Sequence, residues 1–269
     1  MKLFISYQKK IFTSPLIYIS IIGIALLSYM GMPKIDLEFG VIHAFDIMIE
    51  LSVYNKIMMI FVSIPFTATF CNEYNYRVTN SILIRTTENK YLMTHIVMTF
   101  ILSVITAFLG IMLCIATMSL KYPFFVYDMS FDGWAIESLC INGHEYLYLF
   151  IKVLLRSISL AAWSISGLAI SAAFVNPFVA VISPLIFSYI IELFTVNTKS
   201  GKRVIPDLYR LSQGYTNVSE SWIVSCGYII LVFLILAVIF SLVFIFLAKR
   251  RLRNEFSLTG ICSSSAEFP

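Results

Sequence analysis

Six long apolar stretches limit the folds that this sequence can adopt. They span residues 15–32, 56–71, 91–120, 157–175, 178–196 and 222–248. A helix that crosses about 30 Å of hydrocarbon needs roughly 20 mostly apolar residues. In lipid the backbone must satisfy its own hydrogen bonds, so helices are the natural form for such stretches. The pattern predicts an all-α integral membrane protein with six transmembrane helices, of which the second is short.

The composition excludes an ordinary soluble domain. Of the 269 residues, 59% are hydrophobic and only 13% are charged, whereas a packed soluble core needs a larger charged shell. The net charge of +4 comes largely from basic residues beside the apolar stretches. Such residues usually set membrane orientation, so we expect membrane lipids and no nucleic acid as partners.

The five cysteines do not form a disulfide framework. Four of them fall in or beside apolar stretches or in the C-terminal tail, and only Cys140 is expected to face outward. A single outward cysteine has no partner in its own chain. The sequence has no C-x-x-C pair, so we expect no metal site built from thiolates.

The basic residues at both ends predict the orientation. Lys2, Lys9 and Lys10 precede the first stretch, and four basic residues, Lys249, Arg250, Arg251 and Arg253, follow the last one. Both termini are therefore expected in the cytoplasm, which requires an even number of spans. Residues 72–90 then form a cytoplasmic loop. Residues 197–221 form an outer connection, either a plain loop or a partly re-entrant pair of short helices.

The two chain ends differ from the rest of a single domain that spans residues 1–253. Leu3, Phe4, Tyr7 and Ile11 recur at helical spacing among lysines. This predicts an amphipathic helix over residues 1–14 that lies in the headgroup layer, or else a frayed end with orienting lysines. Residues 254–269 are expected to form a tail, whose last part, from Cys262, is a disordered end or a cloning remnant.

Motifs of soluble catalysis are missing. The sequence has no H-E-x-x-H and no G-x-S-x-G. The Gly201-Lys202 pair is not a P-loop, because Val196 stands where the first glycine is needed and Arg203 follows the lysine. We therefore expect no catalytic residues, no metal and no cofactor in this chain. Any ATP-driven work requires ATP and Mg on another chain.

Residues 72–96, NEYNYRVTNSILIRTTENKYLMTHI, interrupt the apolar pattern between the second and third stretches. Glu73, a helical run over residues 74–84, a polar turn and Tyr91 resemble the membrane subunits of type-2 ABC transporters. The resemblance extends to the six spans and to the tight turn at Asn176-Pro177. The small residue often found after the glutamate and the proline of the turn are missing here, which leaves the depth of docking open.

The resemblance implies that this segment is a coupling helix that docks on an ATPase. Tyr74, Val78 and Ile82 would lie on one helix face and enter a cleft of the partner. The implied docking residues are Glu73, Tyr74, Arg77, Val78, Ile82, Arg85 and Glu88. The implied partners are two copies of an ABC ATPase subunit and a second permease subunit, which is the same or a sister chain.

Three ionisable residues lie beside the outer ends of predicted spans. Glu192 is near the outer end of the fifth, and Lys152 and Arg156 are one turn apart before the fourth. A charge left unpaired in hydrocarbon costs roughly 2.5–3.5 kcal/mol or more. Either the side chains reach the outer headgroups, or Glu192 pairs with Arg156 or Lys152 at the rim of a substrate path.

The function that these features favour is export of a hydrophobic or amphipathic peptide or drug across the cell membrane, driven by a separate ATPase. Two alternatives remain. Glu73-x-x-x-Arg77 and Tyr91-x-x-x-His95 faintly resemble motifs of intramembrane CAAX-type proteases, although residue 72 is Asn and no histidine follows His144. The other is a membrane scaffold or sensor that does not transport.

Overall fold

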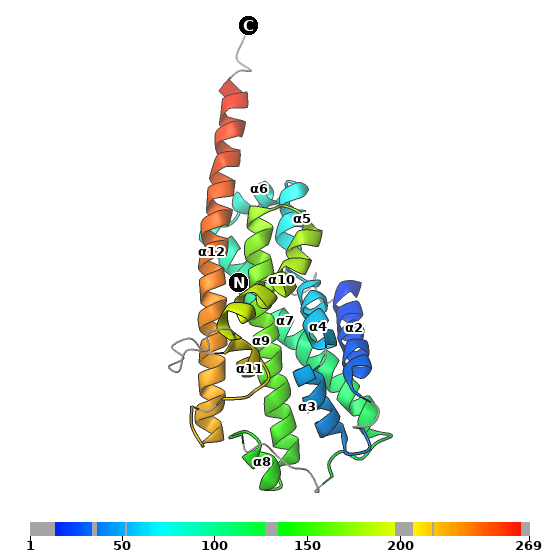
Figure 1. The fold of residues 1–269 in the computed structure, drawn as a ribbon. Coiled ribbons are helices and arrows are strands. Elements are labelled where there is room, and N and C mark those ends of the chain that lie inside the picture. The colour runs from blue at the N-terminus through cyan, green and yellow to red at the C-terminus, as the bar shows by residue number, and fades with distance from the viewer. Residues whose placement is uncertain are drawn as a thin grey trace.

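The computed structural model describes residues 14–33, 37–51, 53–126, 134–196, 207–216 and 218–264, and these residues contain helices and no strand (Figure 1). Four of the described helices are long and apolar enough to cross a membrane, by length and composition. They are α7 (Glu88–Ser119), α9 (Glu145–Ala173), α10 (Pro177–Val196) and α12 (Trp222–Ser264). The chain is therefore an all-helical protein of the membrane type.

The first predicted span corresponds to a shorter helix, α2 (Pro15–Gly31), of 17 residues. The Ser14 side chain accepts a hydrogen bond from the Leu16 amide at 3.3 Å and caps the helix. Pro15 occupies the first turn, where its missing N–H has no cost. Residues 1–13, which include most of the predicted interface helix, lie outside the described residues.

The second predicted span, residues 56–71, is not one helix, and this prediction was wrong. The segment is divided into α4 (Val53–Ser63) and α5 (Thr69–Asn75), with turns between them. Pro65 lies in the interruption. Proline has no amide hydrogen and clashes with the preceding turn, so a straight helix ends just before it.

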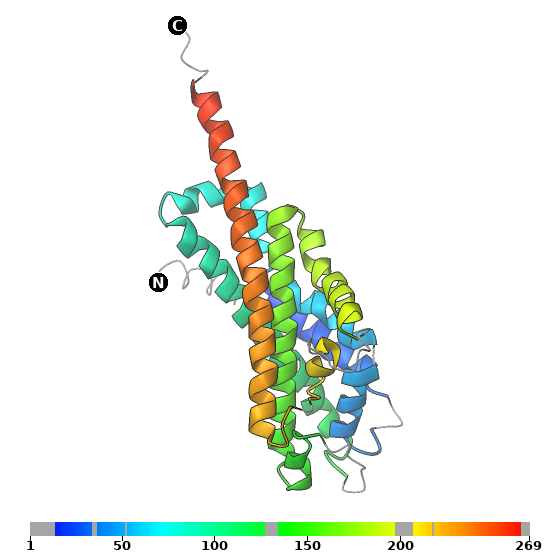
Figure 2. The ribbon, with the colours of Figure 1, turned by 60° about the vertical axis from the view of Figure 1, so that its left-hand side comes forward.

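The fourth and sixth helices are longer than predicted. α9 begins at Glu145 rather than at residue 157, and α12 continues through Ser264 into the predicted tail. In Figures 1 and 2, α12 runs beside α9 and then extends past the other helices.

The long helices place two distant parts of the chain at one end of the bundle. α5 and α6 (Val78–Leu83) lie at the same end as the C-terminal part of α12, and α8 (Ser138–Ile141) lies at the opposite end (Figure 1). The Arg251 guanidinium carbon is 5.3 Å from the centre of the Tyr74 ring. The 72–90 segment and the basic residues after the last span thus share one end.

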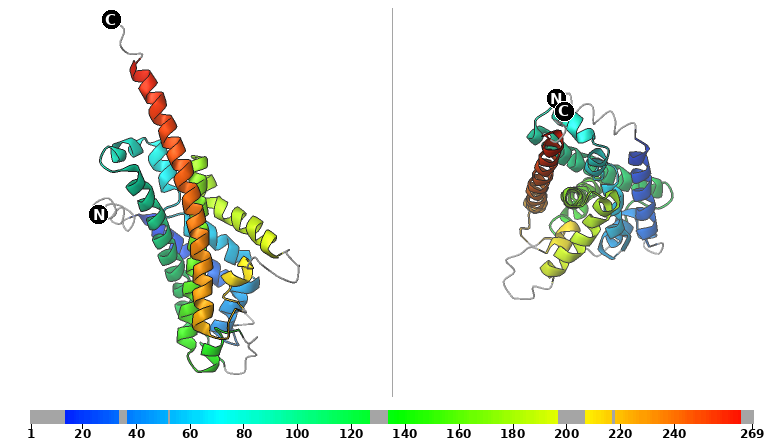
Figure 3. Two further views of the ribbon diagram at one scale, coloured as in Figure 1. Left: turned by 90° about the vertical axis from the view of Figure 1, so that its left-hand side faces the viewer. Right: turned by 90° about the horizontal axis from the view of Figure 1, so that it is seen from above.

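α9 is the central helix of the bundle. α4, α7, α10 and α12 all pack against it, and the view from above shows it surrounded (Figure 3). Many of its buried residues are small, among them Ala161, Ala162, Ser164 and Gly167. A Cβ atom on Gly167 would lie 2.4 Å from the carbonyl oxygen of Ala180 on α10. Small residues let membrane helices approach closely, and here they bring the α9 and α10 backbones together.

Two shorter helices complete the half of the bundle away from α6. α3 (Val41–Leu51) precedes α4, and α11 (Leu208–Ser212) lies in the connection between α10 and α12. Leu208 and Leu211 of α11 are buried in the main apolar core. The part of the 197–221 connection that forms α11 is therefore packed into the protein, whereas Val218, Glu220 and Ser221 are exposed.

Candidate functional site

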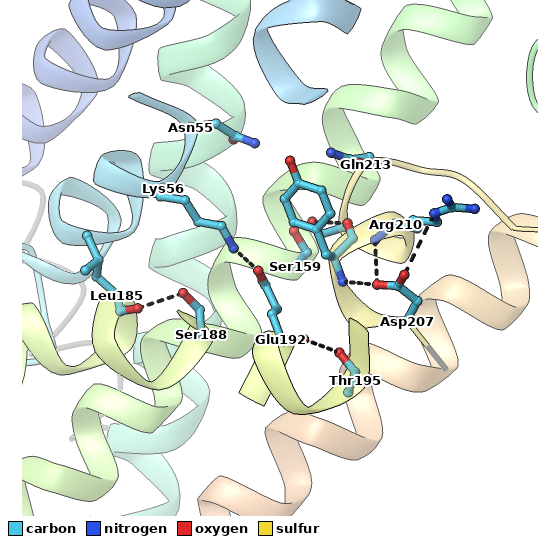
Figure 4. A network of polar contacts seen from close by, with 12 residues as sticks. Asn55, Lys56, Ser159, Leu185, Ser188, Glu192, Thr195, Asp207, Arg210 and Gln213 are labelled. Atoms are coloured by element: carbon cyan, nitrogen blue, oxygen red, sulfur yellow. Dashed lines mark hydrogen bonds and ion pairs between the residues drawn. The ribbon is translucent and has the colours of Figure 1, made fainter. Parts of the chain in front are cut away.

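Polar side chains from α3, α4, α9, α10 and α11 meet inside the bundle, and we call this cluster the buried polar network. Figure 4 shows the part of it around Lys56 and Glu192. The first element of the network joins Lys56 on α4 to Glu192 on α10, with 9% and 7% of these side chains exposed. In Figure 4 the two side chains point toward one another. The Lys56 Nζ is also 5.4 and 5.3 Å from the ring centres of Tyr189 and Tyr209. The ammonium is thus held by a carboxylate and two aromatic rings.

A second ion pair joins α9 to α3. The Lys152 Nζ donates to Asp46 Oδ1 at 2.7 Å and to the Tyr148 hydroxyl at 2.7 Å. The Tyr148 hydroxyl donates in turn to Asp46 Oδ2, also at 2.7 Å. Each Asp46 oxygen therefore has a donor, which a charge removed from water requires.

Arg156 on α9 is buried without a carboxylate. Its side chain donates to the Asn55 carbonyl at 3.2 Å, to Ser159 Oγ at 3.3 Å and to the Ser212 carbonyl at 3.5 Å. Among the described residues, no acidic group lies within ion-pair distance of its guanidinium, and its Nε has no acceptor. Arg156 therefore ties α4 and the end of α11 to α9 through neutral oxygens.

The carbonyl groups at the end of α3 also find donors in this network. Asn55 Nδ2 donates to the Ile49 carbonyl at 2.7 Å. The Tyr209 hydroxyl and Gln213 Nε2, at 3.4 Å, both donate to the Glu50 carbonyl. The last carbonyls of a helix have no partner within the helix, and away from water they need side-chain donors. α11 and its C-cap residue Gln213 supply two of these donors.

The predicted positions and ion-pair partners of Lys152, Arg156 and Glu192 were wrong. Lys152 and Arg156 lie within α9, not before it, and both are buried rather than extended to headgroups. Glu192 is likewise buried, and its ion-pair partner is Lys56 rather than Arg156 or Lys152. Sequence reasoning missed Lys56 and Asp46. Both could have been found from the sequence, because a charged residue within an apolar stretch marks a candidate site.

Glu73 is the buried anchor of the α5–α6 segment. It is 5% exposed, and its Oε2 accepts a hydrogen bond from the Tyr91 hydroxyl at 2.9 Å. The same oxygen is 3.2 Å from Nε2 of His95. Tyr91 and His95 lie one turn apart on α7, and Phe70 packs against both rings. Glu73 thus fixes the end of α5 to the start of α7.

The predicted helix over residues 74–84 is broken. α5 ends at Asn75, Arg77 has a φ of 56°, and α6 begins at Val78. A non-glycine residue rarely adopts this left-handed conformation, and it changes the chain direction sharply. The prediction of one continuous docking helix was therefore wrong.

The break also changes which apolar side chains are exposed. Tyr74 lies against Arg251, and Ile82 packs on the cluster that contains Phe70 and Tyr91. Only Val78 of the predicted stripe is exposed, at 43%, whereas Tyr76 and Ile84 are exposed at 79% and 87%. We call the exposed apolar and basic residues of this segment the α5–α6 surface: Tyr76, Arg77, Val78, Ile84 and Arg85. Glu88 begins α7 beside it and is partly buried.

The described residues contain no group of three His, Cys, Asp or Glu side chains that could hold a metal ion. His43 belongs to α3 and His144 precedes α9, at the end of the bundle away from Glu73. His95 is therefore the histidine that the fold brings to Glu73.

Comparisons of the chain with protein-family models, with curated proteins and with solved structures find no match.

Proposed function

We propose that the chain is the transmembrane subunit of an ATP-driven ABC transporter of the cell membrane, and that the α5–α6 surface docks on a separate ATPase chain. The observation that carries the proposal is the form of this segment. It exposes two large apolar side chains, Tyr76 and Ile84, beside the basic Arg77 and Arg85, while its buried side is fixed to the bundle. Exposed aromatic and arginine side chains are typical anchors of protein interfaces.

The attachment of the segment supports a role in transmitting movement. Glu73 connects it to α7, and Tyr74 connects it to α12 through Arg251. The Cys71 thiol donates to the Ser171 carbonyl of α9 at 3.7 Å. A push on α5–α6 would therefore reach three long helices, which suits a rigid-body shift between two transport states.

The proposed complex contains two ATPase chains, which carry ATP and Mg, and a second permease that is the same or a sister chain. Its proposed activity is export of a hydrophobic or amphipathic peptide or drug. The long apolar helices place much of the chain in contact with lipid, where such substrates accumulate.

The proposal is tested by purifying the full chain from native membranes in mild detergent. The eluate is assayed for ATP hydrolysis, and copurifying chains are sequenced. We expect an ATPase with a P-loop to copurify with the native chain and to be lost with Tyr76→Asp or Ile84→Asp. The matched control is Leu120→Asp, because Leu120 is 88% exposed at the opposite end of α7.

Two results would contradict the proposal. One is that no P-loop ATPase accompanies the native chain under any mild condition. The other is that Leu120→Asp removes the ATPase as completely as Ile84→Asp does, because the loss would then not depend on the α5–α6 surface. Copurification of proteins without ATPase activity would instead favour a scaffold or sensor.

A protease is the second candidate, favoured by one observation: Glu73 and His95 do meet. Against it, no further histidine lies beside them, and position 72 is Asn rather than a second glutamate. Cleavage of a prenylated CAAX peptide by the purified chain, abolished by Glu73→Gln, would support the protease instead of the transporter.

A further inference from the structure

A pocket lies at the end of the bundle opposite α5–α6, between α8 and the segment that leads into α12. Its volume is about 440 Å³, and it belongs to neither the α5–α6 surface nor the buried polar network. This volume is within the range of small-molecule sites. The side chains that define its chemistry are Trp134, Ser138, Ile141, Thr216, Ser219 and Glu220.

Trp134 forms one wall of the pocket, and Tyr215, which does not line the pocket, packs against it. The Trp134 ring lies 5.1 Å from the Tyr215 ring, at an angle of 37°. The Trp134 amide donates to Glu137 Oε2 at 3.0 Å, which fixes the residue at the start of its turn. On Tyr215 the protein already holds one ammonium, because Lys152 Nζ is 4.9 Å from the centre of that ring. The wall therefore suits a second cation, which Trp binds best among aromatic residues.

The charges around this wall are mainly negative. Glu220 lines the pocket, is exposed and has no ion-pair partner among the described residues. Behind the wall, burial and then the charges of Asp46, Glu50 and Glu137 raise the pKa of Tyr215 above its ordinary value. Lys152, which contacts the Tyr215 ring, is already paired with Asp46. A carboxylate without a partner beside an indole ring attracts a positive group.

Polar and apolar side chains line the pocket together. The segment before α12 supplies Thr216, Val218, Ser219 and Glu220, and α8 supplies Ser138 and Ile141. A ligand with a charged head and an apolar body can contact both kinds of side chain at once. An anion would meet Glu220, and a purely apolar ligand would leave its carboxylate without a counter-charge.

We propose that this pocket binds an organic cation, an ammonium or guanidinium group carried on an apolar body, with the cation between Glu220 and Trp134. The proposal goes beyond the transport function and holds whether or not an ATPase docks at the other end. The cation belongs to a free molecule or a peptide side chain, or to the ethanolamine headgroup of a lipid.

The test uses the full chain labelled with 5-fluorotryptophan, in nanodiscs of phosphatidylglycerol. The fluorine line of Trp134 is the one that is missing from Trp134→Phe. Phenethylammonium is the probe, and 2-phenylethanol is its neutral counterpart. We expect a saturable shift of the Trp134 line with phenethylammonium, and at least about tenfold weaker binding of 2-phenylethanol.

Variants locate the binding. Glu220→Gln should weaken phenethylammonium binding about tenfold, because it removes the charge and keeps the shape. Glu38→Gln, an exposed carboxylate between α2 and α3 that does not line the pocket, should change it less than about twofold. Equal binding of the neutral probe, an unchanged affinity in Glu220→Gln, or no saturable shift would each overturn the proposal.

A second arm identifies the source of the cation. If a lipid headgroup fills the pocket, nanodiscs that also contain phosphatidylethanolamine should shift the Trp134 line without added probe, and Glu220→Gln should remove that shift. If the lipid has no effect while phenethylammonium still binds, the cation comes from a free molecule or a peptide.

Discussion

Glu73 and Glu192 are both 5% exposed, yet their surroundings differ. Glu192 faces the ammonium of Lys56 on another helix, whereas Glu73 faces a phenol and an imidazole on α7. The first contact balances two full charges inside the bundle. The second fixes a short helix at the end of the bundle, where the chain turns into an exposed surface. The packing of the bundle therefore depends on the contact of Glu192, whereas the contact of Glu73 positions the proposed docking surface.

Reversing one charge of the Lys56–Glu192 pair should have the largest effect. Glu192→Lys places two ammonium groups together in a buried site, and breaking a buried pair costs about 3–5 kcal/mol. We expect a large fall in the thermal midpoint of the purified chain, measured by size-exclusion chromatography after heating. The double variant Lys56→Glu with Glu192→Lys should recover most of the lost thermal midpoint. A double variant that is no more stable than Glu192→Lys alone would refute the pairing.

Arg156→Met should have the next largest effect. The change leaves the Asn55 and Ser212 carbonyls and Ser159 without this donor, which costs about 1–3 kcal/mol, but it also removes a buried charge that forms no direct ion pair with a described residue. The same heating assay measures the change. A loss as large as that of Glu192→Lys would indicate that the attraction between Arg156 and Glu192 outweighs the cost of burying the guanidinium.

Glu73→Gln should cost less, about 1.5 kcal/mol, because Gln can still accept the hydrogen bond from Tyr91. A double-mutant cycle with Tyr91→Phe isolates the contact. If the two losses simply add, Glu73 does not act through Tyr91. If Glu73→Gln is as damaging as Glu192→Lys, the distinction between the two carboxylates is lost.

Ile84→Asp should change stability least, by less than about 0.5 kcal/mol, because its side chain is 87% exposed. Ile82→Asp is the contrast, since Ile82 packs on the Phe70 and Tyr91 cluster and should lower the thermal midpoint. Equal stability of the two variants would contradict the assignment of buried and exposed sides on α6.

The helices that could be predicted from the sequence are those whose apolar stretch is long enough to cross a membrane, because in lipid such a stretch must be helical. The third, fourth, fifth and sixth stretches became α7, α9, α10 and α12. The prediction of one helix for the second stretch was wrong because it rested on a count of apolar residues. Such a count ignores the missing amide hydrogen of Pro65, which interrupts the helix. α3, with 11 residues, was not recognised as a helix, and with it Asp46 was missed.

The pairing of charges could not be predicted because it depends on which helices become neighbours. Lys56, Lys152 and Arg156 were all available to Glu192, and packing of α4 against α10 selected Lys56. The docking face failed for a different reason. Helical spacing assigned Tyr74, Val78 and Ile82 to one side, but that rule requires an unbroken helix, and the turn at Arg77 removes it.

The donors from α11 to the end of α3 have a mechanical consequence. Tyr209 and Gln213 donate hydrogen bonds to the Glu50 carbonyl. A carbonyl that is removed from water and left without a donor raises the free energy of the folded state. α11 cannot leave its place unless α3 follows or water enters. α11 and the consecutive helices α3 and α4 should therefore travel as one body, so that a displacement imposed on either part is carried to the other.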